Sequence, residues 1–286
     1  MRGYLVTVIL LMTGSAWPLH GVAADAKPDT PLILAVHPYL SSAEIITRFT
    51  PLAEHIAQRV NRRVNVRVGP SYQAHIDAIG RDTVDIAFMG PAPYVILTAR
   101  YGLKPLLARL EIDGVPTFRG SIIVRRDSPL TELSDLKGKR FAFGEPDSTM
   151  GTLVPRYMLL QARVPLAALG AHHNISGHKN VALAVLTGAV DAGAVKDEVF
   201  RDFEPQGLRL LASTPEVSEH LFVTRTDLPP PLIAQLRTAL LTLKDQPDGA
   251  RILRAINSRT TALVSVRDDD YANLREFIRA VDASPP

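Results

Sequence analysis

The feature that most constrains this chain is the alternation of short apolar runs with longer amphipathic stretches. Residues 32–36 form an apolar run typical of a buried strand, and Ser41 and Glu44 have the spacing of a capping box that begins a helix. Alternating valines at 64–68 favour a second strand, and a helix is expected over 72–80. This alternation predicts an α/β fold with mostly parallel sheets.

A second series of strands and helices follows in the middle of the chain. Strands are expected at residues 122–124 and 141–144, and a helix is expected over 149–162. The segments 78–85 and 184–191 each end a helix, turn tightly and begin a strand with Val-Asp. This weak repeat predicts two similar α/β lobes, although two unrelated βα units can resemble each other by chance over so short a stretch.

Further elements complete the predicted pattern. Buried strands are expected at residues 84–88 and 191–195, and a helix over 182–186 precedes the second of them. Apolar positions recur at helical spacing in 232–243 and 271–281. The last part of the chain is therefore predicted to be mostly helical.

Composition excludes several classes of function. The chain has 286 residues, of which 46% are hydrophobic, so it can bury a sizeable core. It has no cysteine, which rules out a disulfide framework, a thiolate nucleophile and a cysteine-based zinc site. The formal net charge is only +3 and the charges are interspersed, so no basic stripe for nucleic acid is present. Common nucleophile and phosphate-loop motifs are missing as well, and we predict neither an enzyme nor a metal or cofactor site.

Residues 1–24 have the pattern of a secretory signal peptide. Arg2 precedes an apolar run at residues 4–12, and the small residues around Ala24 and Ala26 suit cleavage near residue 24 or 26. The alternative is a membrane anchor, but the apolar run is shorter than the roughly 20 residues that span a bilayer. The sequence therefore predicts an exported, soluble mature protein.

The most informative polar segment lies between a strand end at Gly144 and a helix start near Thr149. Ser148 and Thr149 supply hydroxyls, and Gly151 lets the backbone approach a neighbour closely. The free N–H groups and the dipole of a helix N-terminus favour an oxyanion there, and each charge-assisted bond contributes about 1.5–3 kcal/mol. The alternative is that Ser148 or Thr149 only caps the helix. Its place after a strand of an open α/β sheet favours ligand binding.

Five other side chains are candidates for the same site. His178 precedes a predicted helix, and its ring N–H can donate to an anion. Asp197 or Glu198, just past a predicted strand, can accept a proton-bearing oxygen or an ammonium group. Tyr72 and Tyr94 follow Gly-Pro loops. Each has a simpler alternative, which is a surface histidine, a solvated turn or a packing tyrosine.

The chain resembles the phosphate/phosphite/phosphonate-binding proteins that feed ABC importers in the periplasm. The resemblance covers about residues 31–282, and Asp147-Ser148-Thr149-Met150-Gly151 is its strongest element. The supporting segments are residues 84–87, 90–91, 135–144, 153–157, 177–178 and 190–195.

This resemblance implies a type II periplasmic-binding-protein fold, with two α/β lobes, a hinge and a ligand cleft between the lobes. Residues 28–117 plus 222–286 are expected to form lobe 1, and residues 118–221 to form lobe 2. Ligand roles fall on Ser148, Thr149, Gly151, His178 and Tyr72.

Two positions depart from the pattern of the family. Met150 stands where the family usually has a serine, and Phe118 stands where it commonly has a second tyrosine. The acidic ligand contact of the family falls at Asp197 or Glu198, with the register between them open. The resemblance therefore predicts an oxyanion site in which phosphate, phosphite and phosphonate all remain possible ligands.

The implied mechanism is capture of the anion, closure of the hinge and docking on an ABC permease in the inner membrane. The protein is expected to act in the periplasm as a monomer without a cofactor. Three alternatives remain open. One is ligand sensing for a membrane histidine kinase, and another is binding of a different anion such as a sulfonate or nitrate. The third is an enzyme on the same fold, such as a pyrimidine-precursor synthase, which would need an array of reactive histidines or cysteines.

Overall fold

The computed structural model describes residues 30–284. The predicted signal peptide and its cleavage near residue 24 or 26 lie outside this range. Within it, no helix combines the length and the apolar character needed to cross a bilayer.

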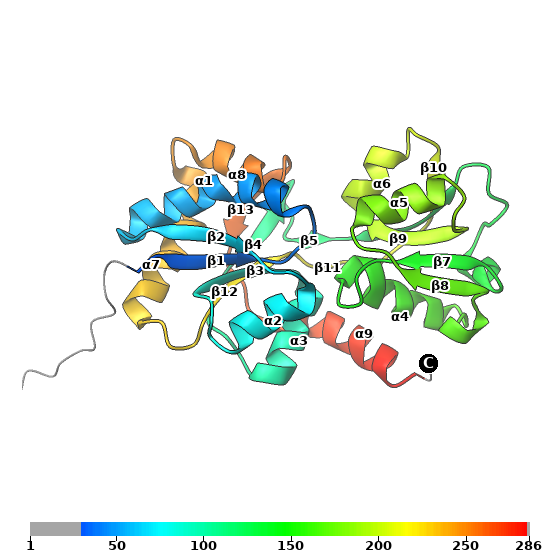
Figure 1. The fold of residues 1–286 in the computed structure, drawn as a ribbon, viewed down its shortest axis with the longest axis horizontal. Helices are drawn as coiled ribbons and strands as arrows, with labels where there is room; N and C mark the ends of the chain where they lie inside the picture. The colour runs from blue at the N-terminus through cyan, green and yellow to red at the C-terminus, as the bar shows by residue number, and fades with distance from the viewer. Residues whose placement is uncertain (1–29, 285–286) are drawn as a thin grey trace, which may run out of the picture.

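The first lobe is built on a six-stranded sheet (Figure 1). In spatial order its strands are β13 (Thr260–Val264), β4 (Leu106–Ile112), β12 (Leu221–Thr224), β3 (Ile86–Met89), β1 (Leu32–Val36) and β2 (Val64–Val68). Helices cover both faces, so the sheet is buried on two sides. One face packs on α1 (Ser42–Val60), α7 (Pro230–Leu241) and α8 (Gly249–Ile256), and the other on α2 (Tyr72–Gly80), α3 (Pro91–Tyr101) and α9 (Ala272–Asp282).

The second lobe is built on a five-stranded sheet. In spatial order its strands are β10 (Leu208–Ser213), β6 (Gly120–Arg125), β9 (Ala192–Lys196), β7 (Arg140–Phe143) and β8 (Ala171–Asn174). The helix α4 (Val154–Gln161) packs on one face, and α5 (His178–Leu186) and α6 (Asp197–Phe203) pack on the other. Short 3-10 turns lie at Leu133–Leu136 and Leu166–Ala168 in this lobe, and at Leu243–Asp245 and Asp268–Tyr271 in the first lobe.

The chain crosses between the lobes at two short strands. β5 (Thr117–Phe118) leads from the first sheet to the second, and β11 (Val217–Ser218) leads back. The two pair with each other as an antiparallel ribbon between the lobes (Figure 1). The predicted two-lobed α/β architecture is therefore confirmed, while the lobe boundaries at residues 117/118 and 221/222 stay a prediction.

The prediction of mostly parallel sheets is wrong. In the first sheet β1 pairs in parallel with β2 and β3, but β12 and β13 pair antiparallel with their neighbours. In the second sheet β7 pairs in parallel with β8 and β9, whereas β6 is antiparallel to both β9 and β10. The physical reason lies largely in the double crossover, because β6 and β12, the first strands of each sheet after a crossing, run opposite to the strands beside them.

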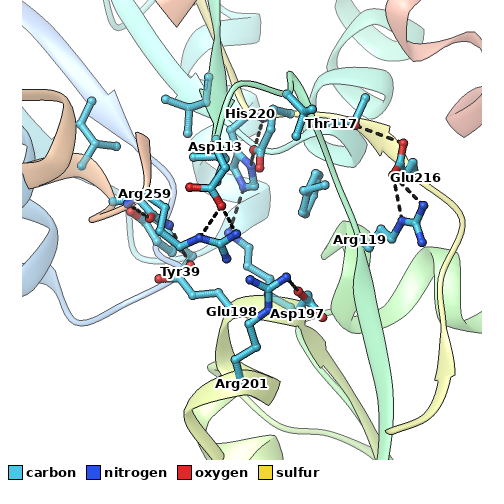
Figure 2. A pocket seen from close by; sticks show the side chains of 18 of the residues that line it. Tyr39, Asp113, Thr117, Arg119, Asp197, Glu198, Arg201, Glu216, His220 and Arg259 are labelled. Atoms are coloured by element: carbon cyan, nitrogen blue, oxygen red, sulfur yellow. Dashed lines mark hydrogen bonds and ion pairs between the residues drawn. The ribbon is translucent and has the colours of Figure 1, made fainter. Parts of the chain in front are cut away.

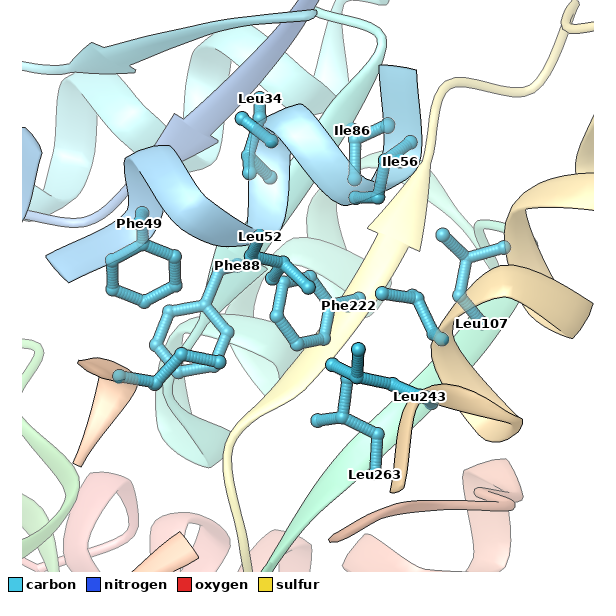
Figure 3. Packing of buried hydrophobic residues seen from close by; sticks show 14 of the residues in the cluster. Leu34, Phe49, Leu52, Ile56, Ile86, Phe88, Leu107, Phe222, Leu243 and Leu263 are labelled. Carbon is cyan, nitrogen blue, oxygen red and sulfur yellow. The ribbon is translucent and has the colours of Figure 1, made fainter. Parts of the chain in front are cut away.

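The hydrophobic core follows the predicted helical faces. In α1 the apolar residues Ile45, Phe49, Leu52 and Ile56 recur at helical spacing, and all four are buried. They pack on the ring of Phe88 and on neighbouring strand side chains (Figure 3). The N-terminus of α1 also matches the prediction, because the side chain of the N-cap residue Ser41 accepts a hydrogen bond from the N–H of Glu44.

Helix boundaries in the second lobe differ from the prediction. The helix expected over 149–162 consists of a π-helical turn at Thr149–Leu153 followed by α4. α5 begins at His178 rather than near residue 182. The strands β10, β12 and β13 and the helix α6 were not predicted. Of these strands only β12 is buried throughout, and its run of apolar residues lacks the polar alternation that marks a half-exposed strand.

Close packing of α5 on β9 depends on Gly193. A Cβ atom at this position would lie 2.7 Å from Cγ1 of Val181 and 3.0 Å from Cγ2 of Val185, both on α5. α5 begins at His178 and β9 ends at Lys196, so this packing sets the relative positions of those two residues.

We predict that Gly193→Ala lowers the free energy of unfolding by about 1–3 kcal/mol, because the added methyl overpacks the α5–β9 contact. Urea unfolding followed by circular dichroism measures this. Gly69→Ala is the matched control, since a Cβ there would have its nearest neighbours at 3.7 Å and no positive φ is needed. Equal stability of both variants and the wild type would contradict the packing argument.

Candidate functional site

Loops from both lobes meet around a small cavity between the two sheets. Several of these loops follow the carboxyl ends of strands β1, β3, β7 and β9, which is where open α/β sheets bind ligands. The residues that line the cavity are His37, Tyr72, Gly90, Phe118, Ser148, Thr149, Met150, Lys196 and His220.

Ser148 begins the helical segment that follows β7. Its Oγ accepts a hydrogen bond from the N–H of Gly151 at 3.1 Å, so the capping interpretation is correct for Ser148. The N–H of Thr152 donates to the Ser148 carbonyl, whereas the N–H groups of Thr149 and Met150 come before this first helical bond. Capping and ligand binding are compatible, because the N-terminal N–H groups and the Ser148 hydroxyl proton remain available to an anion.

Thr149 connects the two lobes. Its Oγ1 accepts a hydrogen bond of 3.0 Å from the N–H of Ala92, in the first turn of α3. Thr149 is buried, and its hydroxyl proton remains to be donated. A residue of the second lobe is thus oriented by the backbone of the first.

Gly151 packs against the end of β7. A Cβ atom here would lie 2.8 Å from Oγ of Ser148 and 3.0 Å from Cα of Gly144. The N–H of Gly144 donates to the carbonyl of Gly151 at 2.8 Å. The predicted close approach at Gly151 therefore occurs within the protein, where it holds the hydroxyl-bearing turn against the sheet.

His178 lies beside this turn at the start of α5. It is only 6% exposed, and its Nδ1 accepts a hydrogen bond of 3.3 Å from the N–H of Lys196. The proton of the neutral ring is therefore on Nε2, and Nε2 has no partner among residues 30–284. Burial, together with the charge of Lys196 and with His220, lowers the pKa of His178 to about 3. His178 is thus a neutral, buried N–H donor without a partner.

Tyr72 approaches the cavity from the first lobe. It is the first residue of α2, and Ser71 caps this helix by accepting from the N–H of Ala74 at 3.1 Å. Tyr72 and Ser148 line the cavity from opposite lobes. Burial and the nearby Glu145 raise its pKa, so the phenol stays protonated.

The two positions that depart from the resembled family form apolar walls. Met150 is buried, and its thioether accepts a hydrogen bond of 3.4 Å from Oγ1 of Thr214. The ring of Phe118, in the crossing strand β5, lies 5.2 Å from the ring of His220. Both residues line the cavity, as predicted, but neither offers a strong donor there.

A chain of charged and polar groups that the sequence analysis missed closes the other side of the cavity. Oε2 of Glu219 lies 2.8 Å from Nδ1 of His220, and Nε2 of the same ring lies 3.2 Å from Nζ of Lys196. Because a carboxylate only accepts, Nδ1 of His220 must donate to it, and Nε2 then accepts from the lysine ammonium. Burial lowers the pKa of Lys196, and the charges of Glu219 and Glu198 oppose this.

A sequence signal for Lys196 did exist. Lys196 ends β9 and therefore occupies the same carboxyl end of a strand that drew attention to Asp197 and Glu198. His37 is similar, because it directly follows β1. His220 precedes β12, a strand that was not predicted, so nothing local pointed to it.

Asp197 and Glu198 do not line this cavity. They line a second, larger pocket that opens between the lobes next to it (Figure 2). Asp197 pairs with Arg201 at 2.7 Å, and Glu198 accepts a bond of 2.9 Å from the side chain of Asn257 in the first lobe. Both acids are the first residues of α6, because the chain changes from strand to helix after Lys196.

Tyr94 also does not line the cavity, contrary to the prediction. Its ring is fully buried in the core of the first lobe, 4.9 Å from the ring of Tyr271. Its hydroxyl donates to Asp268 at 2.6 Å. The Gly-Pro loop before Tyr94 does reach the cavity, through Gly90 rather than through the tyrosine.

Taken together, the cavity presents hydroxyl, imidazole and ammonium donors and apolar walls. Among the described residues that line it there is no aspartate or glutamate. Within residues 30–284 no group of three or more potential metal ligands is found. Such an arrangement suits a small anion held by hydrogen bonds.

Comparisons with known proteins agree with this geometry. The family described as "ABC transporter, phosphonate, periplasmic substrate-binding protein" matches residues 34–271. The phosphate-import protein PhnD of Mycolicibacterium smegmatis is 26% identical, over 92% of this chain and 89% of its own length.

Two solved structures share the fold. PhnD1 of Prochlorococcus marinus in complex with methylphosphonate superposes with a TM-score of 0.78 at 24% identity, covering 88% of this chain and 98% of its own. A binding protein of an ABC phosphonate transporter from Pseudomonas aeruginosa gives a TM-score of 0.79 at 23% identity, covering 89% and 88% of the two chains.

The family match spans most of the chain and both lobes that form the cavity. The type II periplasmic-binding-protein fold expected from the sequence is confirmed by these neighbours. The chain belongs to the family of periplasmic substrate-binding proteins of phosphonate ABC transporters.

Proposed function

We propose that this protein captures a small phosphorus oxyanion in the cavity lined by Ser148, Thr149 and Lys196 and delivers it to an ABC permease. The observation that carries the proposal is the buried, unpartnered Nε2–H of His178 beside a turn rich in hydroxyl and N–H donors. An unsatisfied buried donor is costly, and an anion bound here would satisfy it. The relatives named for phosphate import and for methylphosphonate binding support this class of ligand.

Binding is coupled to closure because both lobes supply groups to the site. Ser148, Thr149 and His178 come from the second lobe, and Tyr72 comes from the first. His220 lies between β11 and β12, where the chain enters the first lobe again. The strands β5 and β11 form the hinge. A ligand that touches both sets of groups binds the closed form better than the open one, and this difference drives closure.

The partner that we propose is a permease of the inner membrane, and the protein acts in the periplasm as a monomer. Family membership supports this role over sensing for a histidine kinase. Transport of the ligand by the reconstituted permease, dependent on this protein, tests the assignment of the partner.

We predict that Thr149→Ala weakens binding of methylphosphonate at least tenfold, since it removes a donor to the anion and the link to Ala92. Isothermal titration calorimetry measures the affinity. Thr149→Ser is the matched control, because it keeps the hydroxyl and should bind within about threefold of the wild type. Unchanged affinity of Thr149→Ala would remove this turn from the site.

We also predict that export removes the signal peptide near residue 24 or 26. Intact mass spectrometry of the protein purified from the periplasm should give an N-terminus at Asp25 or Lys27. A mass that includes Met1 would instead support a membrane anchor.

A further inference from the structure

We propose that Lys196 makes this cavity selective for doubly charged phosphorus oxyanions over singly charged tetrahedral anions. The inference rests on the proposed function, because it concerns the head group that binds in the same cavity. It goes further because it assigns the charge state of the ligand and names the residue that recognises this charge.

The first line of evidence is that three side-chain atoms at or beside the cavity already accept a backbone hydrogen bond. Oγ of Ser148 and Oγ1 of Thr149 each accept from a backbone N–H, at 3.1 and 3.0 Å. Nδ1 of His178 accepts from a third, at 3.3 Å. Each of these groups therefore keeps a proton that it can donate to a ligand.

The second line of evidence is the lack of a carboxylate for a proton on the ligand among the described residues that line the cavity. None of the described residues that line the cavity is acidic, and Asp197 and Glu198 lie in the outer pocket with partners of their own. Nε2 of His220 is taken by Lys196 at 3.2 Å. Nε2 of His37 remains as a neutral acceptor, because Nδ1 of that ring donates to the carbonyl of Phe88 at 3.3 Å. A singly charged phosphonate carries a P–OH group, and this lining offers it neutral acceptors but no carboxylate. The fully ionised form has no such proton.

The third line of evidence is the positive charge itself. The ammonium of Lys196 has three N–H donors, and His220 is the partner that it contacts within hydrogen-bond distance among the described residues. Its other close neighbours are the ring of Tyr39, at 4.9 Å from the centroid, and the ring of Phe118, at 5.9 Å. Donors thus remain for a ligand oxygen, and attraction to each added negative charge is strong at a site shielded from water.

Several titratable groups surround Lys196 and must be considered for any pH dependence. They lie on both lobes and are His37, Tyr39, Arg48, Tyr72, His178, Glu198, Glu219 and His220. Burial lowers the pKa of His37 and His220 well below the ordinary value and that of His178 to about 3. These histidines therefore stay neutral between pH 5.5 and 8. Over this interval a phosphorus oxyanion loses its second proton, with a pKa of about 6 for a phosphate monoester.

The test compares methylphosphonate with methanesulfonate, which has the same tetrahedral shape but stays singly charged throughout. For the wild-type protein, calorimetry at pH 5.5 and pH 8 should show methylphosphonate binding at least tenfold more tightly at the higher pH. Methanesulfonate should bind at least tenfold more weakly than methylphosphonate at pH 8. Its own change with pH reports titration of the protein, including Glu219, and is expected to be less than threefold.

Variants then assign the preference to the lysine. Lys196→Gln should weaken methylphosphonate at least tenfold at pH 8 and reduce its pH effect to less than threefold, while Lys196→Arg should keep the preference for the dianion. Lys137→Gln is the control, because it removes one positive charge from an exposed position. Lys137 precedes the first residue of β7, whereas the site lies beyond the carboxyl end of that strand, so this variant should bind like the wild type.

The outcomes separate this inference from the function on which it rests. If the wild type binds no phosphorus oxyanion at either pH, the proposed function fails. If it binds methylphosphonate and methanesulfonate alike, or if Lys196→Gln keeps the full pH effect, only the charge selectivity by Lys196 is overturned. Should Lys196→Gln fail to fold by circular dichroism, the wild-type pH series and the sulfonate comparison still decide.

Discussion

The site depends on one constraint, which is that polar groups buried between the two lobes must find partners. Ser148, Thr149 and His178 meet it in part by accepting from backbone N–H groups, and each keeps a proton that it can donate. The backbone therefore fixes the chemistry of the site before any ligand arrives. One of these bonds, from the N–H of Ala92 to Oγ1 of Thr149, runs between the lobes, so the closure that we propose also orients this donor.

The sequence allowed prediction of the parts that depend on local patterns. The hydroxyl-bearing turn at Ser148, the helix start at Tyr72 and the position of His178 all follow strand ends or helix caps, and the structure brings them together. Strand pairing is non-local, so the returning strands β12 and β13 and the mixed sheets were missed. The same limitation hid His220, which reaches the cavity only because β12 pairs with β3.

The choice between neighbouring residues at the end of β9 shows where sequence reasoning stops. Lys196, Asp197 and Glu198 are consecutive, and only the change from strand to helix decides which of them faces the cavity. The structure places the lysine in the inner cavity and the acids in the outer pocket. The sequence led us to expect an acidic contact with the ligand. The structure instead lines the inner cavity with hydrogen-bond donors and a lysine, and this difference affects which ligands can bind.

A crystal structure of the protein with methylphosphonate tests the central claim most directly. The account predicts the phosphorus atom in the inner cavity, with its oxygens about 3 Å from Oγ of Ser148, Oγ1 of Thr149, Nε2 of His178 and Nζ of Lys196. A ligand bound instead in the outer pocket, away from the turn that begins at Ser148, would contradict it.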